Sequence, residues 1–362
     1  MKACEWKGNL DSWALLIPVN RDILLTVILI LGKMKGKGLL ITKGLKKRGR
    51  NMSEHSIKTA GVISAAKKLN RSEQTDSLLQ IGSISAIKRI VLTFQVAGID
   101  PIVIITGYDS DIIERELCDY GVIFLHKDNY EQCQLFQLAK LGLEYLQGKC
   151  DRVMFTPVDI PLFSPDTLRK MMACEEKAVS PSYQQRIGHP TLITADIIPM
   201  VLRYQGEAGM PGALVEHRIT RRILEVEDAG IIEDTDQLEY KSELIRKHNS
   251  DIFHPFLRLS LEQEHLFFDA KTKLLLILIQ ETNSVKSACK SMALSYSKAW
   301  HMLNTLEEAV QYKVITRQQG GSRGGKTELT MEGARLLQNY ELLEKRVKDY
   351  TREEFQKIFI GN

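Results

Sequence analysis

The sequence contains few cysteines and no cysteine cluster. Its six cysteines are scattered along 362 residues, and no two of them form a CxxC pair or show the spacing of a metal site. This pattern argues against a disulfide framework and against a cysteine-based metal site. We therefore expect reduced thiols in a cytoplasmic protein.

The sequence also lacks an apolar run long enough to cross a membrane. Near the N-terminus, residues 13–18 and 23–31 are apolar, but polar residues 20–22 separate them, and a bilayer core requires about 20 apolar residues. Residues 33–50 then carry eight Lys or Arg and no acid, the reverse of the order in a signal peptide. We expect no stable membrane insertion. We expect residues 1–52 to form a peripheral N-terminal extension; the alternative is that residues 1–51 come from a start codon placed too early, with Met52 as the true start.

A large net charge of either sign is absent as well. The formal charge is +4, with 44% hydrophobic and 26% charged residues, which is an ordinary globular composition. The length allows two domains. We place a first domain at residues 53–244, a connector at 245–266 and a second domain at 267–355.

The first domain alternates β-branched apolar runs with amphipathic segments. Strands are expected at residues 61–66, 101–106, 122–125 and 152–156, and helices at 85–97, 111–120 and 135–146. Continuously apolar strands between helices indicate a mostly parallel sheet covered on both faces. The fold class is therefore α/β, a three-layer Rossmann-like domain, in which ligands bind at the carboxyl ends of the strands.

Acidic residues follow two of the strand-like runs. Asp159 comes after the strand at 152–156, and Asp234 and Asp236 lie in a strand-like run at 231–236. Carboxylates from two strand ends suit Mg²⁺ with bound phosphates, because they are hard oxygen ligands that leave positions for substrate. Helix capping is the other common role for aspartates at such positions.

The order of short motifs in this domain carries a resemblance. The segments AAKKLNRSEQTDSLLQIGS, TGY, VDIPL, GHP and EDTDQLE resemble the nucleotidyltransferase family that contains the molybdenum cofactor cytidylyltransferases (MobA/MocA-like). The resemblance implies CTP or GTP as donor, a molybdopterin-type acceptor and Mg²⁺. It implies the following roles: catalysis by Arg71 and Asp159, nucleotide binding by Ala65, Ala66, Lys67 and Arg71, acceptor contacts by Gly188 and His189, and metal binding by Asp159 and Asp236.

The loop after the first strand departs from the family pattern. Lys67 and Glu73 stand where the family has glycines, and Asp76 stands where it has a lysine. Glycines let backbone N–H groups cradle a triphosphate, and an aspartate repels one. We therefore favour weak or lost transferase activity over an active cytidylyltransferase. A third alternative is a structural protein that uses both domains as docking surfaces.

The second domain contains a helix-turn-helix pattern at residues 284–310. Apolar residues recur at helical spacing before and after a break at 293–295, and Ser295 suits the N-cap of the second helix. The N-terminal residues of such a second helix face base edges in the major groove. A basic, glycine-rich hairpin at 313–329 follows as a wing. The candidate DNA contacts are Tyr296, Ser297, Lys298, His301, Arg317, Arg323 and Lys326.

Residues 267–350 resemble the winged helix-turn-helix of the molybdate-responsive ModE-type regulators. The segments SYSKAWHMLNTLEE, GGSRGGKTELTMEG and LLQNYELLEK carry this resemblance. It implies binding to double-stranded DNA as a homodimer, and the apolar stripe of residues 331–350 suits the dimer contact. The family's molybdate-binding modules do not follow, because the chain ends at Asn362, so we expect sensing to come from the first domain.

The connector is too apolar for a flexible linker. We expect its phenylalanines and leucines to dock between the domains or on a partner. Its histidines, His248, His254 and His265, lack ligand spacing and are expected to have no specific role.

Overall fold

The structure is a computed structural model that describes residues 57–66, 76–235, 242–318 and 326–361. These residues all belong to the unit Ser56–Asn362. The predicted N-terminal extension, residues 1–52, lies outside the described part of the chain.

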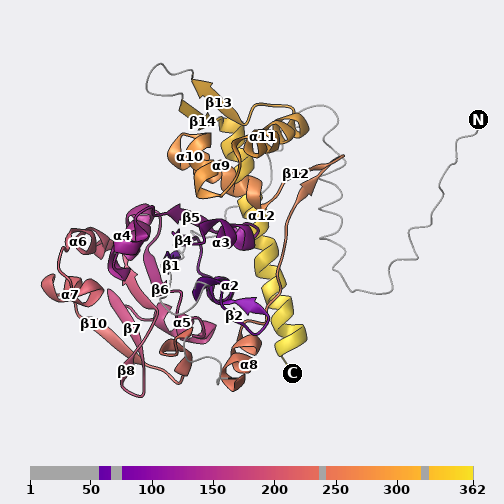
Figure 1. The fold of residues 1–362 in the computed structure, drawn as a ribbon. Coiled ribbons are helices and arrows are strands. Elements are labelled where there is room, and N and C mark those ends of the chain that lie inside the picture. Colours follow the sequence, from indigo (N-terminus) through magenta and orange to yellow (C-terminus); the bar gives the residue numbers. More distant parts are fainter. Residues whose placement is uncertain (1–56, 67–75, 236–241, 319–325, 362) are drawn as a thin grey trace, which may run out of the picture. The chain divides into compact units, whose positions relative to one another are not determined.

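A mixed sheet forms the centre of the first domain (Figure 1). Its order is β10-β7-β9-β6-β1-β4-β5, with β8 paired to β7. Strands β1, β4, β5 and β6 run parallel, whereas β9 is antiparallel to both β6 and β7. The strands are β1 (Thr59–Ala65), β4 (Ile102–Thr106), β5 (Ile123–His126), β6 (Arg152–Pro157), β7 (Ala178–Tyr183), β8 (Arg186–Ile187), β9 (Thr191–Thr194) and β10 (Arg221–Glu225).

Helices cover both faces of this sheet, which gives the three expected layers. Successive residues of β1 point to opposite sides, so that Ile63 joins one core cluster and Val62 the other. Helices α2 (Ala86–Ala97), α3 (Ser110–Leu117) and α5 (Pro165–Met172) pack in the first cluster. Helices α4 (Leu135–Leu146), α6 (Ile198–Arg203) and α7 (Gly209–Glu216) pack in the second. Between β1 and α2 lies a short hairpin of β2 (Gln80–Ile81) and β3 (Ile84–Ser85).

The second domain is a winged helix-turn-helix with its own core. It comprises β11 (Leu261–Glu262), β12 (Leu266–Phe268), α9 (Ala270–Thr282), α10 (Val285–Ser291), α11 (Tyr296–Val310), β13 (Ile315–Gln318), β14 (Lys326–Leu329) and α12 (Met331–Phe355). Ser284 and Ser295 cap α10 and α11 by accepting hydrogen bonds from Ser287 N and Lys298 N. Ala293 adopts φ 50° in the intervening turn.

Helix α8 (Ser242–Asp251) spans the predicted boundary between the first domain and the connector, and a buried histidine anchors it. His248 Nδ1 lies 3.2 Å from the guanidinium of the fully buried Arg89 on α2, and its Nε2 lies 3.2 Å from Thr93 Oγ1. Thr93 donates its own hydrogen to Arg89 O, so His248 carries its proton on Nε2. The expectation that His248 has no specific role is therefore wrong, because it joins α8 to α2.

Three local predictions need correction. Residues 231–235 do not form a strand, because a 3-10 helix at Ala229–Ile231 begins where the Asp228 carboxylate accepts a hydrogen bond from Gly230 N. The first strand of the wing is β13, and it starts two residues later than expected. In the stripe expected at the dimer contact, Leu337 and Tyr340 are buried in the domain's own core. The exposed apolar residues of α12 are Met331, Leu342, Leu343 and Tyr350.

Candidate functional site

The carboxyl ends of β1 and β6 bring two groups of predicted site residues together. These strands are adjacent and parallel, and Val158 N donates to Ser64 O at 3.1 Å just where β6 ends. Ala65 and Ala66 follow on the first strand and are fully buried, and Asp159 follows on the second. The predicted nucleotide loop and the predicted metal ligand therefore leave the sheet side by side. Lys67 and Arg71 lie outside the described residues.

A backbone hydrogen bond ties the second acidic segment to Asp159. Thr235 N donates to Asp159 O at 2.9 Å, so the segment before Asp236 reaches the end of β6. Asp236 itself lies outside the described residues. Within the part of the chain that is described, no three His, Cys, Asp or Glu residues form a group that could hold a metal ion. Among the described residues, the buried hydroxyl of Thr235 has no hydrogen-bond partner. This hydroxyl is therefore available to hydrogen-bond a ligand.

Gly188 and His189 pack against the same segment. His189 N donates to Ile231 O at 2.8 Å, and a Cβ on Gly188 would lie 2.2 Å from that oxygen, so only glycine fits. Burial lowers the pKa of His189 to about 4, so its imidazole is neutral at physiological pH. Its Nδ1 is buried without a partner among the described residues. A neutral imidazole with a free nitrogen suits recognition of a polar ligand.

The loop after β4 packs against Ala66, on the predicted nucleotide side. Tyr108 N donates to Ala66 O at 3.2 Å, and a Cβ on Gly107 would lie 2.6 Å from the Tyr130 ring and 2.7 Å from Ala66 O. Tyr130 belongs to a 3-10 turn that leads into α4. The TGY segment therefore packs closely against Ala66, the residue directly after β1.

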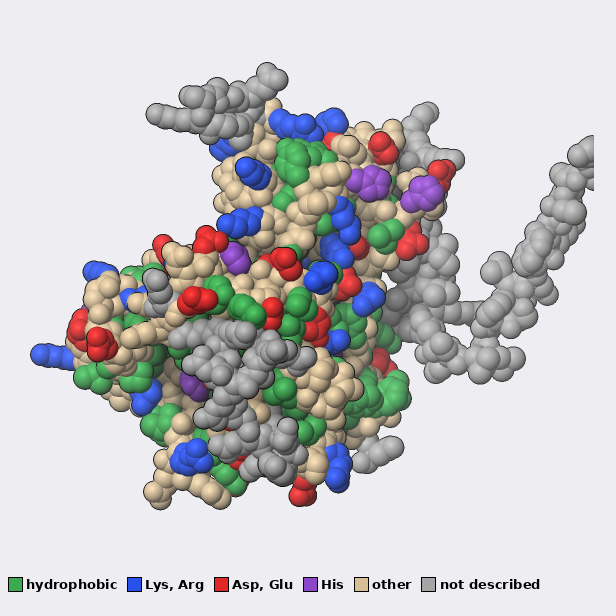
Figure 2. Space-filling view, viewed as in Figure 1, with side chains coloured by type: hydrophobic (Ala, Val, Ile, Leu, Met, Phe, Trp, Pro, Cys, Tyr) green, Lys and Arg blue, Asp and Glu red, His purple; other side chains and the backbone are tan. Residues whose placement is uncertain are grey.

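In the second domain, the residues predicted at base edges form an exposed row at the start of α11. Tyr296, Ser297, Lys298 and His301 are all exposed, whereas Ala299 and Leu303 are buried in the domain core. Lys and Arg side chains gather over this domain (Figure 2). The arrangement is that of a helix held by its inner face with its outer face free.

Two of the three basic residues predicted in the wing are described. Lys326 is exposed, and its Nζ lies 2.6 Å from Glu328 Oε1. Arg317 lies over the ring of Trp300, with Cζ 3.4 Å from the ring centre. Arg323 lies outside the described residues. The sequence interpretation placed Trp300 in the buried stripe and missed this stack. Helical spacing puts Trp300 on the same face as the exposed Tyr296, one turn earlier, but it gives no sign of Arg317, which comes from another element.

The fold and the two sites define a nucleotidyltransferase-like domain joined to a winged helix-turn-helix domain. The family model of the MobA-like NTP transferase domain matches residues 61–225, so this part of the chain is a MobA-like NTP transferase domain. The C-terminal part is homologous to ModE regulators.

Individual relatives agree with this division. The transcriptional regulator ModE of Haemophilus influenzae is 40% identical over 83 residues, which are 23% of this chain and 32% of that protein. The DNA-binding transcriptional dual regulator ModE of Escherichia coli K12 is 36% identical over 87 residues, 24% of this chain and 33% of that protein. The chain thus spans about a third of the length of the curated relatives it matches.

Solved structures also resemble the chain. A nucleotidyl transferase from Methanothermobacter thermautotrophicus is 17% identical, with a TM-score of 0.44, over 52% of this chain and 99% of that one. A manganese complex of a Mycobacterium tuberculosis protein is 17% identical, with a TM-score of 0.43, over 52% of this chain and 98% of that one. No helix of the described residues is long and apolar enough to cross a membrane.

Proposed function

We propose that this chain is a transcriptional regulator of molybdenum cofactor or molybdoenzyme genes that binds double-stranded DNA through α11 and the wing. The observation that carries the proposal is the exposed row at the start of α11, Tyr296, Ser297, Lys298 and His301, held on a buried inner face. Homology of this part of the chain to ModE regulators supports it. The protein acts in the cytoplasm.

In this proposal, the MobA-like domain binds the ligand that controls DNA binding. In this proposal it retains a pocket for CTP or GTP and a molybdopterin-type ligand, but transfers nucleotide weakly or not at all. Support comes from the replacement of family glycines by Lys67 and Glu73 and of the family lysine by Asp76. These side chains obstruct or repel a triphosphate.

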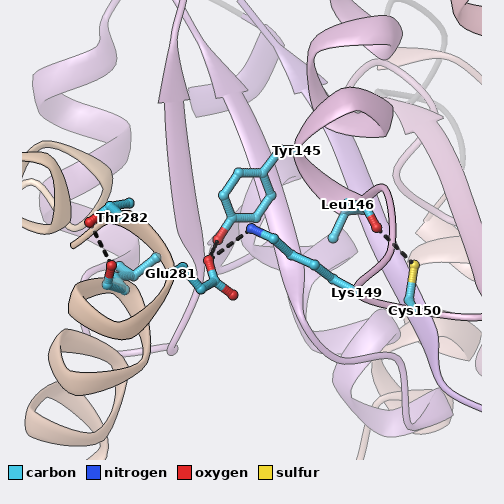
Figure 3. Close-up of polar contacts among 7 residues, drawn as sticks. Tyr145, Leu146, Lys149, Cys150, Glu281 and Thr282 are labelled. Carbon is cyan, nitrogen blue, oxygen red and sulfur yellow. Dashed lines mark hydrogen bonds and ion pairs between the residues drawn. The ribbon is translucent and has the colours of Figure 1, made fainter. Parts of the chain in front are cut away.

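A polar contact between α4 and α9 supports communication between the two domains (Figure 3). Tyr145 Oη on α4 and Lys149 Nζ, in the turn that follows α4, donate to the same oxygen of Glu281 at 2.7 and 2.8 Å. Glu281 lies in the last turn of α9, directly before the helix-turn-helix. The other end of α4 follows the turn of Tyr130, which packs against Gly107, so α4 links the predicted nucleotide side to α9.

An active Mg²⁺-dependent cytidylyltransferase with an autoregulatory DNA-binding domain is the second candidate. The hydrogen bond from Thr235 N to Asp159 O favours it, because it draws together the two segments that carry the family's metal ligands. Asp159 and Asp236 would hold the ion. When bound, Mg²⁺ would neutralise charge on the phosphates. His189 would remain neutral and contact the acceptor.

Homodimerisation belongs to the same proposal. The exposed apolar side chains of α12, Leu342, Leu343 and Tyr350, lie on the helix that follows the wing. A second copy would cover them and would place two copies of α11 on one DNA duplex.

Two measurements test this function. The purified protein should bind duplex DNA with an affinity that falls steeply with salt, because phosphate contacts release counterions. Salt-independent or absent binding contradicts the regulator. Incubation with CTP or GTP, Mg²⁺ and molybdopterin should release little pyrophosphate. Robust release that is abolished in Asp159→Ala would establish the enzyme instead.

A further inference from the structure

Trp300 lies where α11 packs against the wing, and it contacts residues of both elements. Arg317 of β13 lies over its ring, with Cζ 3.4 Å from the ring centre. The rings of Tyr296 and Trp300 lie in a T-shaped arrangement, with centroids 5.8 Å apart and planes at 77°. A guanidinium this close to an indole face is attracted by the ring's quadrupole. The stack therefore joins the two elements that the DNA-binding proposal invokes.

Arg317 differs from the neighbouring basic residues in its charge partner. Lys313 Nζ lies 2.5 Å from Glu307 Oε2, and Lys326 Nζ lies 2.6 Å from Glu328 Oε1. In the described ranges, Arg317 makes no ion pair with a carboxylate. Either lysine must leave its acid to reach a phosphate, whereas Arg317 need not. A guanidinium held by its face also keeps N–H donors along its edge.

We propose that Trp300 is a positioning residue that holds Arg317 ready to contact a backbone phosphate of duplex DNA beside the groove that α11 enters. This inference rests on the proposed DNA-binding function. The stack restricts the rotamers of an exposed, flexible side chain before DNA arrives, so that less conformational entropy is lost on binding. The contact supplies affinity and not sequence preference, because phosphates carry no base information.

Trp300 is also partly buried and packs against the domain core, so a structural role must be separated from the positioning role. A double-mutant cycle makes this separation. If Trp300 acts through Arg317, removing the indole weakens DNA binding only while Arg317 is present. If it acts only through the fold, the loss is the same with and without Arg317.

The experiment uses the full chain and a fluorescein-labelled DNA duplex of mixed sequence, with anisotropy measured over a range of salt concentrations. We expect Trp300→Leu to lower affinity about two- to fivefold, the worth of an exposed cation–π contact. The slope of log affinity against log salt concentration should become shallower. It should approach that of Arg317→Ala, which we expect to be shallower than the wild-type slope by about one. In the Arg317→Ala background, Trp300→Leu should have no further effect. Trp300→Phe keeps an aromatic face and the packing, and should retain most of the affinity.

Two outcomes would overturn this inference and leave the proposed DNA-binding function intact. One is an equal loss of affinity from Trp300→Leu in both backgrounds, and the other is wild-type affinity and slope in the Trp300 variants while Arg317→Ala weakens binding. If Trp300→Leu is unfolded by circular dichroism, the cycle is run with Trp300→Phe, whose effect should still vanish without Arg317. Salt-independent or absent binding by the wild-type chain would instead remove the proposed DNA-binding function and this inference with it.

Discussion

Tyr145 on α4 donates its phenolic hydrogen to Glu281 on α9 across 2.7 Å (Figure 3). Lys149 Nζ approaches the same carboxylate oxygen and also lies 3.4 Å from the centre of the Tyr145 ring. Burial, together with the neighbouring carboxylate of Glu281, raises the pKa of Tyr145. The phenol therefore stays protonated and keeps donating at any physiological pH.

Removing this hydroxyl should destabilise the chain modestly. Tyr145→Phe keeps the ring and the cation–π contact but leaves Glu281 with Lys149 alone, so we expect a loss of about 1 kcal/mol in the free energy of unfolding. Urea unfolding measures it. Tyr183→Phe is the matched control, because among the described residues its hydroxyl accepts a hydrogen bond only from Nε2 of its neighbour Gln184, at 3.3 Å. Equal effects of the two substitutions would mean that the Tyr145 hydroxyl contributes nothing specific.

The sheet and most helices could be predicted from sequence because their signals are local. The amphipathic period at 135–146 predicts α4 with the observed bounds, and the apolar run at 101–106 predicts β4 to within one residue. The segment at 231–235 could not be predicted in this way. Its turn depends on Asp228, whose carboxylate also accepts hydrogen bonds from Ser164 N and Thr167 Oγ1 some sixty positions earlier. No local pattern encodes that contact.

The features of the candidate sites also fall into those that local sequence predicts and those that depend on contacts between distant segments. Residue type and spacing predicted Asp159 at a strand end and the exposed start of α11, because both depend on local order. The role of Thr235 beside Asp159 and the Trp300–Arg317 stack depend on contacts between separate elements. The same is true of His248, whose partner Arg89 lies on a helix of the first domain.

Acid should destabilise the protein through His248. Burial, and then the charge of Arg89, lower its pKa to about 3 from an ordinary value of 6.5. Below about pH 6.5, His248 binds a proton in the unfolded chain but stays neutral in the folded chain. The contribution of His248 to the free energy of unfolding is therefore fully present above that pH and decreases as the pH drops toward 3.

A non-titrating residue at position 248 should remove this dependence. We expect His248→Gln to be less stable than wild type at pH 7, by about 1–3 kcal/mol, because it disturbs a buried hydrogen-bond network. The difference in the free energy of unfolding between wild type and His248→Gln should narrow by about 2 kcal/mol between pH 6.5 and 5, because only the wild type loses stability through position 248. Urea unfolding at a series of pH values checks this, and a constant difference would show that His248 takes no part in acid destabilisation.

Metal binding should depend on Asp159 whether or not the protein turns over substrate. Asp159→Asn is nearly isosteric but removes one unit charge, worth on the order of 4 kcal/mol at about 4 Å and an effective dielectric of about 20. We expect Mg²⁺–CTP affinity, measured by calorimetry, to fall at least tenfold, a change of about 1.4 kcal/mol. Asp166→Asn is the control, because that aspartate is exposed and paired with Lys170 on α5. Unchanged affinity in Asp159→Asn would remove Asp159 from the metal site.

The two kinds of DNA contact should respond differently to substitution. Lys298 lies in the exposed row at the start of α11, so Lys298→Ala should change which sequences are preferred. Arg323 belongs to the predicted wing tip, so Arg323→Ala should weaken binding to all sequences and lower the salt slope by about one. Lys326→Ala should weaken binding less, because Lys326 is already paired with Glu328. Electrophoretic shift assays on several duplexes distinguish these effects, and wild-type affinity and slope in Arg323→Ala would show that the wing does not contact phosphates.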